Sequence, residues 1–147
     1  MADLFERGGQ RGARPRYERR PIVNACCYAL RTGCAWRLLP KNFPPWQATY
    51  MSFKRWAAAG VFAAMHDRLR QQWRQRMGKA QDAQQPLRPQ VVPKGFVVQA
   101  KRWVVKRTHA WDEFARRLMA HHDRSNWASL AWVWLAEARI LASRMTT

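Results

Sequence analysis

A basic segment, KRWVVKRTHAW at residues 101–111, raises the question of whether this chain carries out chemistry or only binds. It has the spacing of an amphipathic helix, and a site for a divalent cation such as magnesium needs hard oxygen ligands such as carboxylates. Lys106 stands in the middle of the segment instead. A charged ammonium group cannot ligate magnesium and repels it, so the segment is a poor candidate for metal chemistry.

Cysteine and histidine side chains form no recognisable site either. Cys26, Cys27 and Cys34 are odd in number, and no second Cys or His group lies at metal-ligand spacing. We expect small buried apolar side chains in a reducing cytosol. The four histidines are His66, His109, His121 and His122. No nucleophile is evident beside them, and we expect them to be solvated or locally hydrogen-bonded.

The charge balance indicates an anionic partner. Lys and Arg number 27 against nine acids, a formal net charge of +18 in a chain of 147 residues. Nucleic acid is the first candidate, because neutralised phosphates release counterions, and an anionic membrane surface is the second. The start of the chain lacks the apolar core of a signal peptide, and no apolar stretch reaches the length of a membrane span. We therefore expect a cytoplasmic protein that does not enter a membrane.

Hydrophobic periodicity predicts a mainly α fold, because apolar residues recur at three- and four-residue spacing. Gly33 and Gly60 are expected to end two of the helices. The last helix, from about Ser125, is expected to bury one stripe: Trp127, Leu130, Ala131, Trp134, Ala138 and Leu141. The expected order is a flexible basic arm (1–17), a module of three helices (18–77), a linker (78–95) and a C-terminal helical pair (96–147). The first helix of this pair is expected at about residues 101–120.

The N-terminal module favours a helix-turn-helix-like arrangement whose helix at about 47–59 enters the major groove of DNA. Plain helix packing remains the alternative. Arginines of the arm are candidates for a narrow minor groove, or for loose phosphate contacts. The DNA-binding candidates are Arg14, Arg16, Arg37, Gln47, Thr49, Ser52, Lys54 and Arg55.

Two segments resemble bacterial insertion-sequence transposases of the insertion-sequence-five type. The first contains ALRTGCAWRLLP and a helix that starts after PPW, and the second is GFVVQAKRWVVKRTHAWDEFARRL. The resemblance implies a ribonuclease-H-like core in which two Asp and one Glu hold Mg²⁺ for DNA strand transfer. It also adds Arg102, four residues before the position of that Glu, to the DNA-binding candidates.

The sequence departs from this family pattern in two ways. The position of the catalytic Glu is occupied by Lys106, and Glu113 lies two helical turns further on. About 24 residues separate Met77 from Lys101, too few for the central sheet that supplies both Asp residues. Asp82 is the only acidic residue in this interval. We expect an internally deleted transposase without its sheet, with no catalytic residue, no metal site and no cofactor.

The leading hypothesis is therefore a transposase-derived protein that binds the terminal inverted repeats of a transposon as double-stranded DNA without cleaving them. It would compete with intact transposase or associate with it, or with a second copy of itself. The alternatives are an active transposase of the DDE type and a remnant without function. Whether the two halves pack together decides if apolar side chains of the C-terminal helices are left exposed, among them Trp111 and Phe114.

Overall fold

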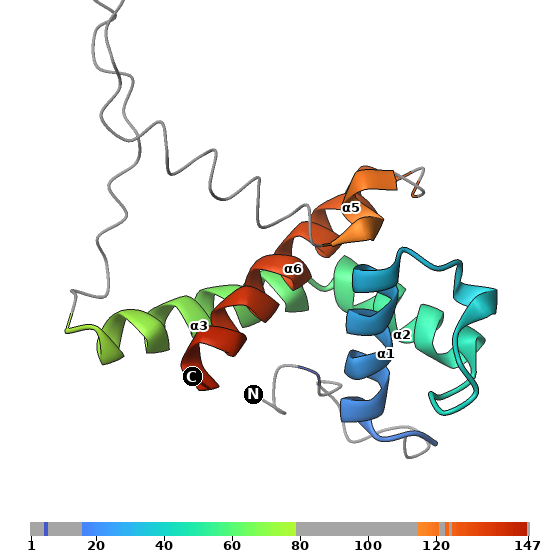
Figure 1. The fold of residues 1–147 in the computed structure, drawn as a ribbon, viewed down its shortest axis with the longest axis horizontal. Helices are drawn as coiled ribbons and strands as arrows, with labels where there is room; N and C mark the ends of the chain where they lie inside the picture. Colours follow the sequence, from blue (N-terminus) through green and yellow to red (C-terminus); the bar gives the residue numbers. More distant parts are fainter. Residues whose placement is uncertain (1–4, 6–15, 79–114, 121–122, 124, 147) are drawn as a thin grey trace, which may run out of the picture.

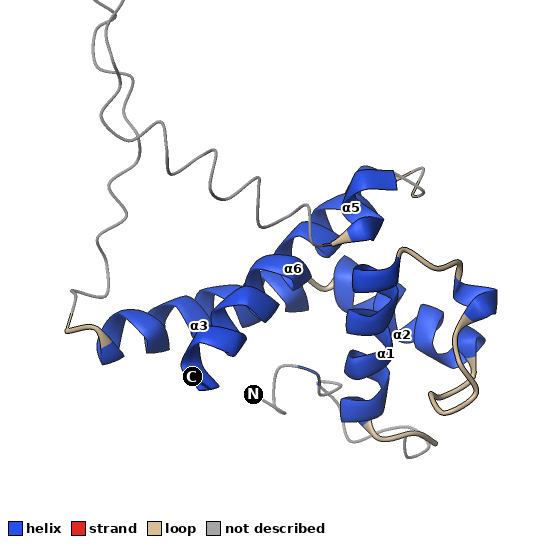
Figure 2. Cartoon of the chain, viewed as in Figure 1, coloured by secondary structure: helices blue, strands red, loops and turns tan. Residues whose placement is uncertain are grey.

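A computed structural model describes residues 5, 16–78, 115–120, 123 and 125–146. Arg14, Arg102, Lys106, nearly all of the basic arm and the linker after Gly78 lie outside the described residues, as does the expected helix before residue 115. In the part that is described, all regular structure is helical, and the prediction of a mainly α fold is confirmed (Figure 2). The elements are α1 (Arg19–Thr32), the short 3₁₀ helix η2 (Trp36–Leu38), α2 (Trp46–Ala58), α3 (Val61–Arg76), α5 (Arg116–Ala120) and α6 (Asn126–Thr146).

Two glycines end helices as predicted. Gly33 takes a left-handed backbone conformation with φ of 69°, and its N–H donates to the carbonyl of Ala29 at 3.0 Å. Gly60 has φ of 68° and separates α2 from α3. Glycine adopts this conformation without the steric cost that a Cβ brings. Both helix ends are therefore encoded locally in the sequence.

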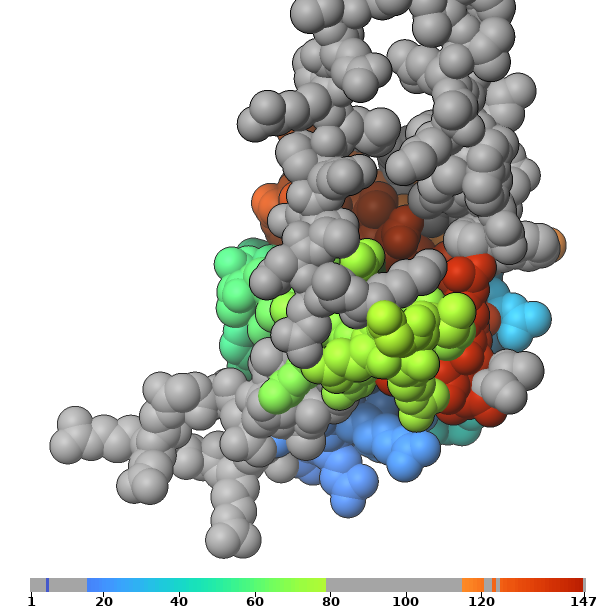
Figure 3. Space-filling view, turned by 90° about the vertical axis from the view of Figure 1, so that its left-hand side faces the viewer, coloured from blue at the N-terminus to red at the C-terminus, as the bar shows by residue number. Residues whose placement is uncertain are grey.

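The helices form two groups that pack against each other (Figure 1). In the first group, α2 passes behind α1. In the second, α3 and α6 lie side by side and run in the same direction (Figures 1 and 3). The ring of His66, in the first half of α3, contacts that of Trp134 near the middle of α6, and Arg76 at the end of α3 reaches Met145 near the end of α6. The Arg76 guanidinium donates to the Met145 carbonyl at 2.6 Å. The short helix α5 packs on α1.

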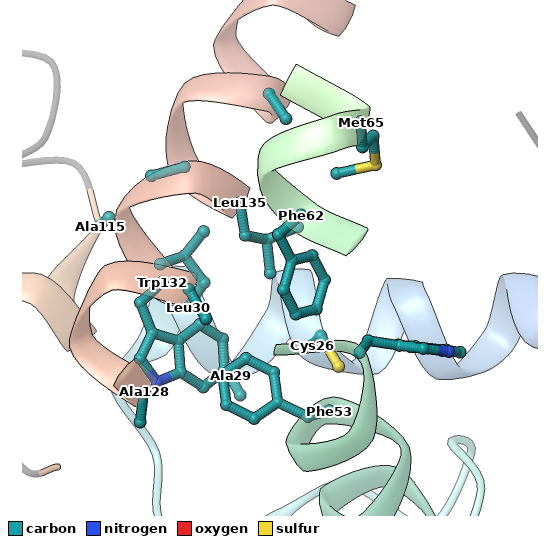
Figure 4. Packing of buried hydrophobic residues seen from close by; sticks show 14 of the residues in the cluster. Cys26, Ala29, Leu30, Phe53, Phe62, Met65, Ala115, Ala128, Trp132 and Leu135 are labelled. Carbon is teal, nitrogen blue, oxygen red and sulfur yellow. The ribbon is translucent and has the colours of Figure 1, made fainter. Parts of the chain in front are cut away.

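One hydrophobic core joins residues from both halves of the chain (Figure 4). The Trp132 side chain of α6 is 1% exposed and stacks on Phe53 of α2, with ring centroids 4.2 Å apart and an interplanar angle of 22°. Trp36 of η2 lies 5.5 Å from both rings. Phe62 of α3 adds a further ring against Phe53. The C-terminal helices therefore complete the core of the N-terminal helices and do not form a separate unit.

The buried face of α6 differs from the predicted stripe. Ala131 and Ala138 are buried as expected, but Trp127 and Leu130 are 41% and 56% exposed. The residues that α6 buries are Ala128, Ala131, Trp132, Leu135, Ala136 and Ala138. Apolar residues surround much of this helix, so spacing alone does not select a face. The partners α1, α2 and α3 select it, because Trp132 fits against Phe53.

Candidate nucleic-acid interface

The outer face of α2 combines polar and basic side chains that point away from the core. Gln47, Met51, Lys54 and Arg55 are all exposed, at positions that share one side of a helix. Gln and Arg can each make paired hydrogen bonds to base edges, and Lys can address phosphates or guanine. Three of the residues predicted to contact DNA, Gln47, Lys54 and Arg55, therefore lie together on an accessible face.

The opposite face of α2 is buried, and two of the residues predicted to contact DNA lie on it. Thr49 is fully buried, and its hydroxyl lies 3.3 Å from the Pro45 carbonyl, to which it donates. Ser52 is 6% exposed, and its Oγ accepts a hydrogen bond from Arg55 Nη2 at 3.2 Å. Neither side chain is accessible to a DNA groove in this packing, which argues against the predicted contacts of Thr49 and Ser52 with DNA. Polarity alone predicts an outward-facing side chain, whereas hydrogen bonds to nearby groups allow short polar side chains to be buried.

Arg37 lies in the connection between α1 and α2. It is exposed, and its guanidinium carbon is 5.6 Å from the ring centroid of Trp46, the first residue of α2. The neighbouring Trp36 is tied into the core, so Arg37 projects from an anchored turn. The connection covers residues 33–45, longer than the three- or four-residue turn of a standard helix-turn-helix. A helix-turn-helix-like mode of binding stays a prediction.

The outer face of α1 was missed by the sequence analysis. Arg20, Asn24, Tyr28 and Arg31 are exposed and recur at helical spacing. Tyr28 contacts Phe43 of the connection, with ring centroids 5.3 Å apart, so the connection is held against this face. These residues lie on the side of α1 opposite its apolar stripe, so the sequence spacing that identifies the stripe also identifies them. Lys41, exposed in the same connection, was also missed, and Arg16, a predicted contact, is exposed just before α1.

The electrostatics of this region favour an anion. No Asp or Glu occurs between Glu18 and Asp67, an interval that contains α1, the connection and α2. The basic residues in the interval are Arg19, Arg20, Arg31, Arg37, Lys41, Lys54 and Arg55. With no acid in the interval to offset them, a cationic surface results, of the kind that attracts phosphates.

The cysteines are poorly suited to chemistry. Burial, and then the neighbouring Cys27, raise the pKa of the Cys26 thiol far above its ordinary value, while Arg117 opposes the shift. Burial also raises the pKa of Cys27. Both thiols are free and stay protonated at neutral pH, whereas the thiolate is the nucleophile and the metal ligand. Among the described residues, no group of three or more His, Cys, Asp or Glu side chains gathers in a way that could hold a metal ion.

The part of the chain that the structure describes contains no helix long and apolar enough to cross a membrane. Residues 1–66 match the family model described as "Putative transposase of IS4/5 family (DUF4096)". The predicted resemblance of the N-terminal region is therefore confirmed, and the matched residues include α1, η2, α2 and the beginning of α3. Searches of curated proteins and of solved structures found no match.

Proposed function

We propose that this chain is a transposase-derived protein that binds double-stranded DNA at the ends of an insertion sequence and does not cleave it. The outer face of α2, together with Arg37, would contact the DNA. The observation that carries the proposal is the coincidence of two ranges. The exposed basic and polar residues of α2 lie inside an acid-free interval, residues 19–66, and this interval lies wholly inside residues 1–66, which match the IS4/5 family model.

The chemistry of these side chains supports contact with both bases and phosphates. Gln47 begins the outer face and suits an adenine edge, while Lys54 and Arg55 lie two turns further along the helix. Arg37 sits beside the first residue of α2, where it would address the backbone of the same duplex. Because Met51 lies between them on this face, an apolar contact to a thymine methyl group is also available.

Loss of cleavage is proposed from the sequence. Two-metal phosphoryl transfer needs several carboxylates held rigidly together, and the resemblance puts Lys106 where one of them belongs. A protein that binds transposon ends without cleaving them would compete with intact transposase for the same sites. We expect co-expression of this chain to lower the excision rate of a matching element, and an unchanged rate would contradict this regulatory role.

The binding test is a fluorescence anisotropy titration with two labelled duplexes. One carries the terminal inverted repeat of an intact IS4/5-type element, and the other has the same composition in scrambled order. We expect a preference for the inverted repeat that persists as salt is raised. Equal affinities that fall steeply with salt would reduce the activity to phosphate attraction. Nicking on addition of Mg²⁺ would instead support an active transposase.

Matched variants locate the interface. Arg55→Gln removes one charge from the outer face of α2, and Arg76→Gln removes one from the far end of α3, well away from α2 in Figure 1. We expect Arg55→Gln to weaken binding to the inverted repeat by about 1–3 kcal/mol, and Arg76→Gln to have a much smaller effect. Similar losses in both variants would show that affinity follows net charge and not the outer face of α2.

A further inference from the structure

Arg117, on the short helix α5, is a charged residue buried in the part of the molecule that the IS4/5 family model does not match. Its side chain is 4% exposed. The guanidinium donates from Nε to Asp123 Oδ2 at 3.3 Å and from Nη2 to Asp123 Oδ1 at 3.2 Å. This fork uses both oxygens of one carboxylate and fixes the plane of the guanidinium.

The third nitrogen of the Arg117 guanidinium, Nη1, bonds to the N-terminal region. Nη1 donates to the carbonyl of Cys34 at 2.9 Å, and Cys34 directly follows the glycine that ends α1. The guanidinium carbon also lies 5.3 Å from the ring centroid of Trp36 and 4.8 Å from that of Trp132. Arg117 therefore touches the backbone and a side chain of the same short segment, residues 34–36, at the point where η2 begins.

Stability alone is a weak explanation for this arrangement. A buried ion pair often contributes no more to folding than apolar side chains of similar volume. The directions of the contacts are more informative. Three N–H groups of the Arg117 guanidinium donate to fixed acceptors, and the guanidinium also lies close to the rings of Trp36 and Trp132. Such an arrangement sets the conformation of residues 34–36, and the next residue is Arg37, a candidate DNA contact.

We propose that Arg117 is a positioning residue for DNA binding, which fixes the turn that carries Arg37 relative to the outer face of α2. The proposal rests on the proposed function, in which Arg37 contacts DNA. Under it, α5 and α6 act as part of the DNA-binding module: Trp132 fills the core behind α2, and Arg117 sets the turn before it. These helices thus have a role in binding that does not depend on a catalytic one.

A double-mutant cycle between Arg37 and Arg117 tests the proposal. Arg37→Gln removes the candidate contact, and Arg117→Lys keeps the charge but cannot serve Asp123 and Cys34 with one planar fork. With the labelled inverted-repeat duplex, we expect Arg37→Gln to weaken binding about tenfold in the wild-type chain. In the Arg117→Lys chain we expect it to weaken binding less than about twofold, because a mispositioned Arg37 has little contact left to lose.

Controls separate positioning from folding. Arg116→Lys changes an exposed neighbour on the same helix and should leave the full effect of Arg37→Gln intact. A cooperative thermal transition above the assay temperature establishes that each variant is folded. If Arg117→Lys is unfolded there, Asp123→Asn replaces it, because it loosens the guanidinium while leaving the arginine in place.

The outcomes are distinguishable. An equal loss of affinity from Arg37→Gln in both backgrounds overturns the positioning role and leaves the proposed DNA interface standing. No loss from Arg37→Gln in the wild-type chain removes Arg37 from the interface and overturns the positioning role with it. Absence of any preference for the inverted repeat in the wild-type chain overturns the proposed function itself.

Discussion

The N-terminal helices and the C-terminal helices of this molecule differ in what their sequences specify. α1 and α2 each have one apolar face and one polar face, and they lie within the residues that match a transposase family. α6 lies outside that match and has apolar residues on several sides, yet it supplies Trp132 and Leu135 to the common core. The boundary of a family match is therefore not the boundary of a folding unit.

The largest effect that tests this shared core is expected at Trp132. Trp132→Ala removes the ring stacked on Phe53, and we expect the free energy of unfolding to fall by about 3–5 kcal/mol. Trp127→Ala, on the same helix but 41% exposed, is the matched control and should cost about 1 kcal/mol or less. Urea denaturation measures both. Comparable costs would mean that α6 does not pack on α2 through Trp132.

A smaller effect is expected where α1 ends against α5. A Cβ at Gly33 would lie 3.3 Å from Arg116 Cβ, whereas one at Gly60 would meet nothing within 4 Å. Both glycines have positive φ, which costs an L-residue about 1–2 kcal/mol. We expect Gly33→Ala to destabilise the protein more than Gly60→Ala, because it adds a tight contact with α5 to the same backbone strain. Equal shifts in the denaturation midpoint would argue against a close approach of α5.

The smallest effect concerns the pH dependence of stability. Burial raises the pKa of the Cys26 thiol, so the unfolded chain loses this proton first as the pH rises past about 8.5. The contribution of the Cys26 thiol to the free energy of unfolding is fully present below that pH. It declines above that pH by at most about 1.4 kcal/mol per pH unit.

We therefore expect the stability of Cys26→Ala to fall less steeply than that of wild type between about pH 8.5 and 10. Denaturant titrations at a series of pH values provide the measurement. Cys27 is present in both proteins, so the difference between their slopes isolates the Cys26 thiol. Parallel curves would mean that Cys26 is open to solvent and does not belong to the core.

The helices of the N-terminal region could be predicted because their signals are local. Glycine at the left-handed positions after α1 and α2, and apolar residues on one side of each helix, specify both the helix ends and the buried face. The candidate interface was predicted in part. Gln47, Lys54 and Arg55 face outward, but Thr49 and Ser52 do not, because short polar side chains can satisfy their hydrogen bonds near their own backbone.

The packing of the C-terminal region could not be predicted in the same way. Leu130 and Trp127 have spacing as suitable for burial as that of Leu135 and Trp132, and only the partner surfaces distinguish the two sets. The burial of Arg117 was also hidden, since its acceptors are Asp123 and the Cys34 carbonyl, which is 83 positions away in the sequence. A basic residue in a basic helix gives no sign that it is buried.

The hydrogen bond from Arg117 to Cys34 joins residues 83 positions apart in the chain, and this has a consequence for the order of folding. Proteins built on such distant contacts fold more slowly than helical proteins built on local ones. During synthesis, α1, α2 and α3 leave the ribosome well before Trp132, and Phe53 lacks its stacked partner ring in that interval. The nascent chain is therefore exposed to aggregation until α6 emerges, and its yield in cells should depend on how quickly that happens.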